Sequence, residues 1–145
     1  MLYKAKTVMA VAGLNRGKFD AWLSKGIIVP TKVPKRSGDR AGFDFDDIMK
    51  INIICYLADH GVSLAISAQL AREMVFEQLH SYMDEHLQEP EDLWAIINLD
   101  NPLENAILSV VSHPLPYPFS IILDLSRFFR LTWDALKTIC LPGRI

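Results

Sequence analysis

The stretch that decides the fold is residues 6–30, KTVMAVAGLNRGKFDAWLSKGIIVP. Its first part predicts a short helix over 8–12, which the side chain of Thr7 can cap. Gly13-Leu14-Asn15 follows as a tight turn, because glycine accepts a positive φ at no steric cost. The chain is therefore expected to turn sharply as soon as its first helix ends.

A second helix is predicted from Arg16 to Lys25, with Gly26 ending it. Three large apolar residues recur at i, i+3 and i+4 and therefore share the inner face of this helix: Phe19, Trp22 and Leu23. Two short helices around a glycine-containing turn predict a helix-turn-helix.

A basic hairpin is expected next to the helix pair. The β-branched run Ile27-Ile28-Val29 predicts a strand that Pro30 ends, and a returning strand is predicted over 43–45. The loop between them carries four cations: Lys32, Lys35, Arg36 and Arg40. Strand, loop and strand together predict a wing, so that residues 1–62 form a winged helix-turn-helix domain.

Two further helices are predicted after the hairpin. Asp44 and Asp47 have the spacing of a capping arrangement for a helix over about 46–60, which His60-Gly61 closes. Ser63 can cap a long helix over 64–87, whose apolar positions follow helical spacing for several turns. Such length exceeds what a small domain needs for its own core, so residues 63–89 are interpreted as a dimerisation helix.

The rest of the chain, residues 90–145, predicts a small β-α-β-α domain. An acidic break over 89–92 marks the boundary, and strands are predicted over 93–99 and 119–123. Asn101-Pro102-Leu103-Glu104 has the composition of a helix start. A last helix, capped by Asp124 or Ser126, is expected to reach about 139, with an apolar face of Leu125, Phe128, Phe129, Leu136 and Ile139. The fold class is thus α+β, mainly α.

Charge is unevenly distributed along the chain. Residues 1–50 hold ten Lys and Arg against five Asp and Glu, whereas residues 51–145 hold five against twelve. A basic first third on an acidic body favours a module that meets a polyanion. An ordinary solvated charged face is the competing interpretation.

Several classes of protein are disfavoured. No stretch has the layout of a signal peptide, and no apolar run reaches the ~18 residues of a membrane span. Cys55 and Cys140 belong to no Cys-x-x-Cys pair, so a disulfide framework or a zinc ribbon is not expected. The sequence predicts a soluble, cytoplasmic protein.

Residues 6–75 resemble the MerR family and the related phage and plasmid excisionase-type regulators. The matching series is Gly13-Leu14-Asn15, Trp22, Lys25-Gly26-Ile27-Ile28, Pro30, Arg40, Phe43, Asp47-Ile48, Leu57 and Gly61-Val62-Ser63-Leu64. The resemblance implies a protein that binds double-stranded DNA as a homodimer, with RNA polymerase as a further partner. It also implies that the protein is bacterial or prophage-encoded and nucleoid-associated.

Two departures from the family pattern stand out. Asp20 occupies a position where MerR-like proteins usually place an arginine, and one extra residue lies between Arg40 and Phe43. An acidic residue at position 20 cannot make the phosphate contact that the family assigns to that arginine. Residues 90–145 resemble no effector domain.

The candidate DNA-binding residues fall into two groups. Asn15, Arg16 and Lys18 start the second helix, where side chains reach base edges in the major groove, and Gly17 leaves room for close approach. The wing cations Lys32, Lys35, Arg36 and Arg40 suit phosphates, which set affinity and register but not sequence. A solvated helix start and a charged loop are the corresponding structural alternatives.

Catalytic, cofactor and metal sites are not assigned. His80, Asp84 and His86 could approach one another on a helix, but their acidic neighbours favour a solvated face. Aromatic residues of the tail (Trp94, Tyr117, Phe119, Phe128, Phe129 and Trp133) fit a core better than a ligand pocket. No phosphate-binding glycine loop or nucleophilic triad is present in the sequence.

The leading hypothesis is a homodimeric, sequence-specific DNA-binding transcription regulator. An architectural or excisionase-type factor that bends DNA is the first alternative. A winged-helix module that binds a protein and not DNA is the second, and Asp20 is the residue that favours it.

Overall fold

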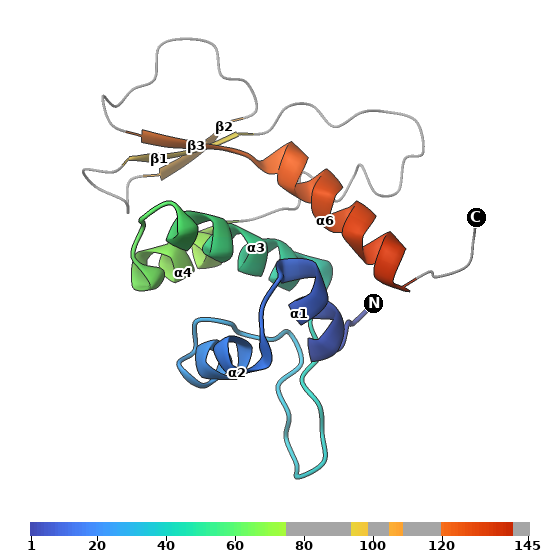
Figure 1. The fold of residues 1–145 in the computed structure, drawn as a ribbon. Helices are drawn as coiled ribbons and strands as arrows, with labels where there is room; N and C mark the ends of the chain where they lie inside the picture. Colours follow the sequence, from blue (N-terminus) through green and yellow to red (C-terminus); the bar gives the residue numbers. More distant parts are fainter. Residues whose placement is uncertain (75–93, 99–104, 109–119, 141–145) are drawn as a thin grey trace.

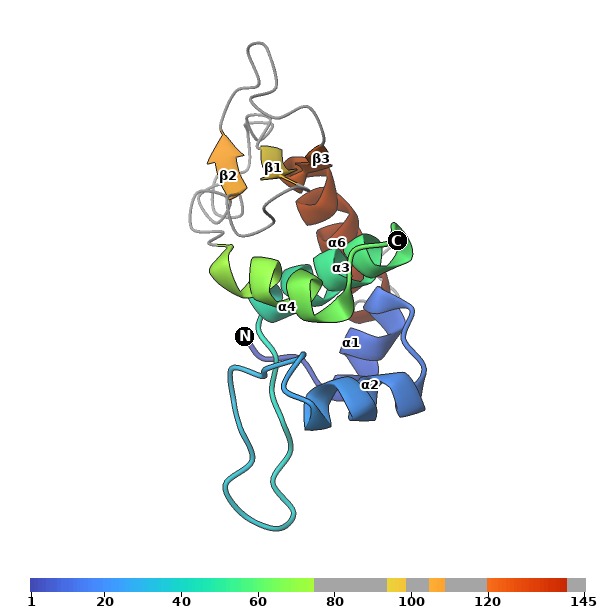
Figure 2. The same ribbon diagram turned by 90° about the vertical axis from the view of Figure 1, so that its left-hand side faces the viewer.

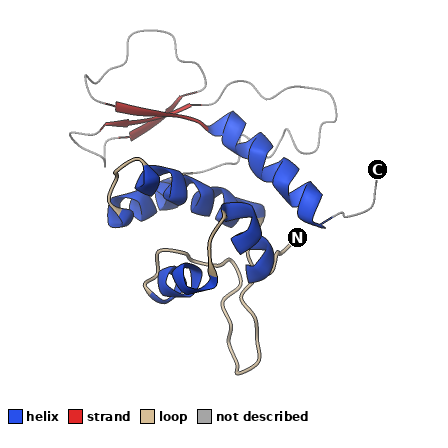
Figure 3. Ribbon diagram, in the orientation of Figure 1, coloured by secondary structure: helices blue, strands red, loops and turns tan. Residues whose placement is uncertain are grey.

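The computed structural model describes residues 1–74, 94–98, 105–108 and 120–140, and these residues are mainly helical (Figure 3). The helices are α1 (Ala5–Ala12), α2 (Arg16–Ser24), α3 (Phe45–Asp59), α4 (Leu64–Glu73) and α6 (Leu125–Cys140). The strands are β1 (Trp94–Asn98), β2 (Asn105–Leu108) and β3 (Ser120–Asp124).

The first two helices and their turn are confirmed, with one correction at the start. α1 begins at Ala5, and its N-cap is Lys4, which makes no capping bond through its side chain. Thr7 is therefore not a cap: it lies inside the first turn, and its backbone N–H donates to Lys4 O at 2.9 Å. Gly13 has φ of 65°, the left-handed conformation that the tight turn requires.

The strand predicted over 27–29 is wrong. The backbone N–H groups of Ile27 and Ile28 both donate to Trp22 O, at 2.9 and 3.3 Å, so the segment folds back onto the end of α2. Ile28 is buried in the core. Ile27 and Ile28 therefore pack against the end of α2, and no strand pairing forms along residues 27–29.

A loop over residues 31–42, here called the hairpin loop, replaces the predicted strand-loop-strand wing. Lys32 and Gly42 exchange both backbone hydrogen bonds, at 2.9 and 3.0 Å. The returning strand predicted over 43–45 is also wrong, because Phe43 pairs with Tyr3 through an isolated bridge and Phe45 already starts α3. Between Lys32 and Gly42 the loop forms no strand (Figure 3).

The capping prediction for α3 is confirmed. Asp44 Oδ1 accepts from Asp47 N at 2.9 Å, and Asp47 Oδ2 accepts from Asp44 N at 3.2 Å, which is a reciprocal capping box. His60 is the C-cap, as expected. This helix supplies much of the core through Ile48, Met49, Ile51, Ile53, Ile54 and Leu57.

Helix α4 is shorter than predicted. Ser63 caps it by accepting from Ile66 N at 3.3 Å, but the helix ends at Glu73 and not near position 87. Met74 adopts an extended backbone, with φ of −72° and ψ of 131°, and is buried against the core. Positions 75–87 of the predicted helix lie outside the described residues.

The C-terminal part corrects the predicted β-α-β-α order. Its strands form an antiparallel sheet in the order β2-β1-β3, in which Ile96 is opposite both Ala106 and Ile122. The helix expected after Asn101 is wrong where the structure describes it, because Asn105–Leu108 pairs with β1 as a strand. This pairing outweighs the local helix-start signal of the Asn-Pro dipeptide.

Helix α6 joins the C-terminal part to the core of the N-terminal part. Asp124 caps it by accepting from Arg127 N at 2.8 Å, as one of the two predictions had it. The helix packs on α1 and α3, with the Phe129 ring 4.9 Å from that of Phe45. Ile139, which the sequence predicts on the apolar face of this helix, is 38% exposed.

The two views agree on the layering of these elements. The sheet and α6 lie on one side of α3, and α2 and the hairpin loop lie on the other, at the opposite end of the molecule (Figures 1 and 2). The basic elements are thus kept together and away from the C-terminal part.

Candidate nucleic-acid interface

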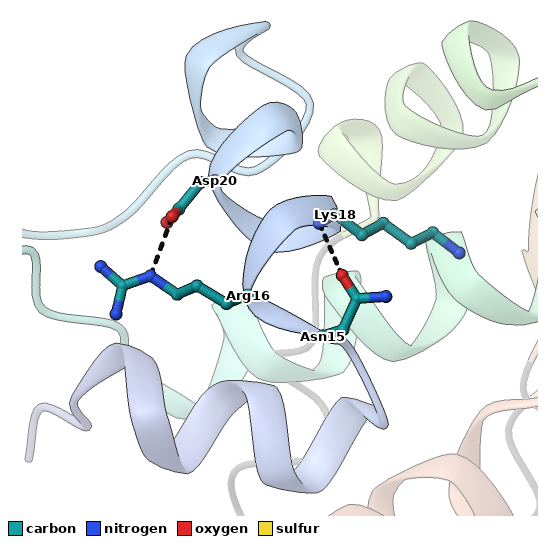
Figure 4. Close-up of polar contacts among 4 residues, drawn as sticks. All are labelled: Asn15, Arg16, Lys18 and Asp20. Carbon is teal, nitrogen blue, oxygen red and sulfur yellow. Dashed lines mark hydrogen bonds and ion pairs between the residues drawn. The ribbon is translucent and has the colours of Figure 1, made fainter.

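The exposed face of α2 carries small residues, with Arg16 and Asp20 on one flank and Lys18 on the other. Phe19 and Trp22 are buried, at 1% and 5% exposure, and fix which side of the helix faces the core. Because successive helix residues are about 100° apart, Gly17, Ala21 and Ser24 point away from that core. Arg16 and Lys18 flank this outer face on opposite sides, and in Figure 4 their side chains leave the helix in opposite directions.

Asn15 has a structural role at the start of α2. Its side-chain Oδ1 accepts from Lys18 N at 2.8 Å and caps the helix. A bidentate contact of asparagine with adenine needs the same oxygen as an acceptor. The two roles compete, so Asn15 is better suited to holding the helix start than to reading a base with both groups.

Arg16 is paired with Asp20 one turn further along α2. Its Nε donates to Asp20 Oδ2 at 2.8 Å, and the side chains are 79% and 54% exposed (Figure 4). Sequence reasoning identified both residues but missed their pairing, although the i, i+4 spacing of opposite charges was a usable signal. The acidic departure at position 20 therefore neutralises a neighbouring cation.

Lys18 is also held by the residue four positions on. Its Nζ lies 4.8 Å from the centroid of the Trp22 ring, within the range of a cation–π contact. Trp22 is thus a core residue, as predicted, and its ring also positions a cation. Both exposed cations of α2 have defined directions before any partner arrives.

The four cations of the hairpin loop are all exposed: Lys32, Lys35, Arg36 and Arg40. The tip is organised by Asp39, whose N–H donates to Arg36 O at 3.1 Å and whose Oδ2 accepts from Lys35 N at 3.3 Å. The loop extends from the body beside α2 in both views (Figures 1 and 2). The structure therefore brings the two predicted groups of cations to the same end of the molecule.

Thr31 fastens the root of the hairpin loop to the first turn of α3. Its N–H donates to Asp47 Oδ2 at 2.8 Å, and its Oγ1 lies 2.7 Å from Asp44 Oδ2 and 2.8 Å from Asp47 Oδ2. Burial raises the pKa of Asp47 above its ordinary value, against the opposing effect of the hydrogen bonds from Thr31. Nothing in the sequence beyond the capping box pointed to this contact.

Other candidate sites receive less support. No group of three potential metal ligands occurs among the residues that the structure describes, and His80, Asp84 and His86 lie outside them. A pocket of about 240 Å³ lies between residues 27–31, α3 and α4 and is lined mainly by apolar side chains. Phe129 and Trp133 pack edge-on against Phe45, in agreement with a core role.

Two short helices around a glycine turn, with exposed cations on the second helix and the adjoining loop, define a helix-turn-helix protein. Residues 3–74 match the model of the MerR HTH family of regulatory proteins. The chain therefore carries a MerR-family helix-turn-helix over this range, while residues 75–145 are outside the match. No curated protein matches the chain.

The family match sets the general function. A MerR helix-turn-helix is a regulatory, DNA-binding domain and not an enzyme family, and it indicates a DNA-binding transcription regulator. In the described part of the chain, no helix has the length and apolar character needed to cross a membrane.

Proposed function

We propose that this chain is a sequence-specific regulator that binds double-stranded DNA as a homodimer, with α2 in the major groove and the hairpin loop acting as a wing. The observation that carries the proposal is the placement of both exposed cation groups at one end of the molecule (Figures 1 and 2). That end belongs to the segment matched by the MerR HTH family.

The outer face of α2 suits close approach to the floor of a groove. Gly17 and Ala21 present little bulk there, so the backbone of α2 can come near the base edges. Arg16 on one flank and Lys18 on the other then reach bases or phosphates on either side. Arginine and lysine both donate to the O6 and N7 acceptors of guanine, which is the commonest specific contact.

The hairpin loop is proposed to grip the sugar-phosphate backbone. Its four cations are exposed and lie on a loop fixed at its root by Thr31, so they extend from the body of the protein toward the same partner as α2. Neutralised phosphates release condensed counterions, so the affinity is expected to fall steeply with salt.

A two-fold symmetric dimer is part of the proposal. The match to the MerR HTH family supports it, whereas α4 ends at Glu73 and does not continue as the dimerisation helix predicted over 63–89. Symmetry predicts an inverted repeat whose half-sites lie near multiples of ~10 bp. RNA polymerase is the proposed further partner. The protein itself is proposed to be cytoplasmic and nucleoid-associated, encoded by a bacterium or a prophage.

Selection of bound sequences from a random duplex pool tests the proposal. The expected result is an inverted-repeat consensus that Arg16→Ala degrades more than Lys35→Ala does, while Lys35→Ala lowers affinity evenly across sequences. Arg130→Ala, which removes an exposed cation on α6, is the matched control and should leave binding unchanged. Failure of the wild type to retain any duplex at low salt overturns the proposal.

A protein-interaction module is the second candidate, and one observation favours it. The carboxylate of Asp20 neutralises Arg16 on the very face that is proposed to meet DNA. A gel shift with random genomic fragments separates the two, since an interaction module gives no retardation at low salt. Mapping of bound sites relative to promoters then distinguishes a regulator from an architectural factor.

A further inference from the structure

An acidic side chain on a DNA-facing helix needs an explanation, and the contact between Arg16 and Asp20 supplies one. The inference below rests on the proposed function, because it concerns how α2 selects a base. Asp20 Oδ2 accepts from Nε of Arg16 at 2.8 Å, and the two residues are one helical turn apart. The carboxylate therefore contacts the inner edge of the guanidinium, next to the side-chain stem.

The outer edge of the same guanidinium is left for another partner. Arginine has five N–H donors, and four of them belong to the two terminal nitrogens. The contact with Asp20 uses only Nε, and in Figure 4 the two terminal nitrogens lie at the outer end of the side chain. Their parallel donors match the O6 and N7 acceptors that guanine presents in the major groove.

We propose that Asp20 is a positioning residue that holds Arg16 in the orientation in which it reads guanine. The contact at Nε restricts a long and otherwise free side chain before DNA arrives. Ordering an immobilised side chain of this kind has a free-energy cost on binding, and an existing contact reduces it. Neutralisation within the pair also limits the repulsion between Asp20 and phosphates.

Lys18 provides the contrast within the same helix. Its Nζ is held over the Trp22 ring, which fixes a direction but offers no planar pair of donors. An ammonium group acts as a point charge, so it discriminates less sharply between bases. Recognition of guanine is accordingly assigned to Arg16 and Asp20 together.

The test begins with the full-length wild type and the duplex selected from a random pool. Each guanine of the consensus is replaced in turn by 7-deazaguanine, which lacks the N7 acceptor, and affinity is measured for wild type, Arg16→Lys, Asp20→Ala and Asp20→Glu. The affinity of the wild type is expected to fall about tenfold when one particular guanine of each half-site is replaced. For Arg16→Lys and Asp20→Ala the same replacement is expected to lower affinity much less, and Asp20→Glu is expected to recover part of the sensitivity.

Random duplex serves as the second readout. Asp20→Ala removes a negative charge, so its affinity for random duplex should rise while its affinity for the selected site falls about tenfold. Asp39→Asn, which removes a negative charge from the hairpin loop but keeps an oxygen that can accept from Lys35 N, is the charge-matched control: it should raise both affinities and keep the sensitivity to 7-deazaguanine. An exposed pair adds little to stability, so matching thermal melts are expected for the Asp20 variants.

The outcomes separate the inference from the proposed function. If the wild type retains no duplex, the proposed function fails and the inference fails with it. If a consensus is obtained but no guanine in it depends on Arg16, only the inference is overturned. The same conclusion follows if Asp20→Ala raises both affinities and keeps full sensitivity to 7-deazaguanine, because Asp20 then acts only by repulsion.

Discussion

Thr31 donates its backbone N–H to Asp47 Oδ2 at 2.8 Å, which ties the root of the hairpin loop to the first turn of α3. The hydroxyl of the same threonine is within hydrogen-bonding distance of Asp44 and Asp47, the two residues of the capping box. One side chain thus connects an exposed, basic loop to a helix whose residues fill the core.

Replacing Thr31 by valine tests this connection. The variant keeps the backbone donor but removes the hydroxyl from two carboxylates, and the expected loss in the free energy of unfolding is about 1 kcal/mol. Urea denaturation measures it. Thr31→Ser retains the hydroxyl and is the control, and its free energy of unfolding is expected to change by about a few tenths of a kcal/mol at most. Equal stability of the Val and Ser variants would contradict the role assigned to the hydroxyl.

The cations at the tip of the hairpin loop should act through charge alone. Lys35→Ala and Arg36→Ala are each expected to weaken binding to every duplex and to reduce the slope of log affinity against log salt by about one. Titrations over a range of salt concentrations provide the measurement. A change in the selected consensus, with no change in the slope, would show that these residues read bases.

Local patterns predicted the helix-turn-helix correctly because its determinants are close in sequence. The glycine turn, the inward spacing of Phe19 and Trp22, and the Asp44–Asp47 capping box all act within one or two helical turns. The candidate cations followed from the same local reasoning, and the structure places them at one end of the molecule.

The remaining errors come from contacts between segments that are distant in sequence. The strand at 105–108 exists because β1 pairs with it, which no local helix-start signal can foresee. The sequence predicts Ile28 in a β-strand, but its backbone N–H donates to the carbonyl of Trp22 and its side chain is buried in the core. The pairing of Arg16 with Asp20 is different: its signal was present in the spacing and was missed.

Cys55 and Cys140 should react at very different rates. Burial raises the pKa of the Cys55 thiol from the ordinary 9.0 to about 11, whereas Cys140 is exposed at the end of α6. At pH 8, iodoacetamide is therefore expected to modify Cys140 first, and Cys140→Ser should leave only the slow phase. Mass spectrometry of timed samples measures both rates, and equal rates would contradict the burial of Cys55.

The same thiol makes stability depend on pH in the alkaline range. Because its pKa is raised in the folded state, the folded protein keeps a proton that the unfolded chain loses above about pH 9. The contribution to stability is complete below pH 9 and is lost as the pH rises through 11. Urea denaturation of wild type and Cys55→Ala across this range should show the difference in slope.

The packing of α6 against α3 includes a polar contact that can be tested by itself. Asn52 Nδ2 donates to Thr132 Oγ1 at 2.8 Å, and Thr132 is buried. Thr132→Val leaves the amide donor unpaired and is expected to lower the free energy of unfolding by about 1–3 kcal/mol. Thr138→Val, on the exposed side of the same helix, is the control; similar losses for both variants would contradict a specific role for Asn52.

The position of α6 also determines how damage to this protein should be interpreted. Val8 of α1 and Leu136 of α6 belong to one hydrophobic core, so the first and last described helices are expected to unfold in a single cooperative transition. A genetic screen for lost DNA binding should then recover substitutions in α6 as readily as in α2. Those in α6 will reduce the amount of folded protein, whereas those on the outer face of α2 will leave it unchanged.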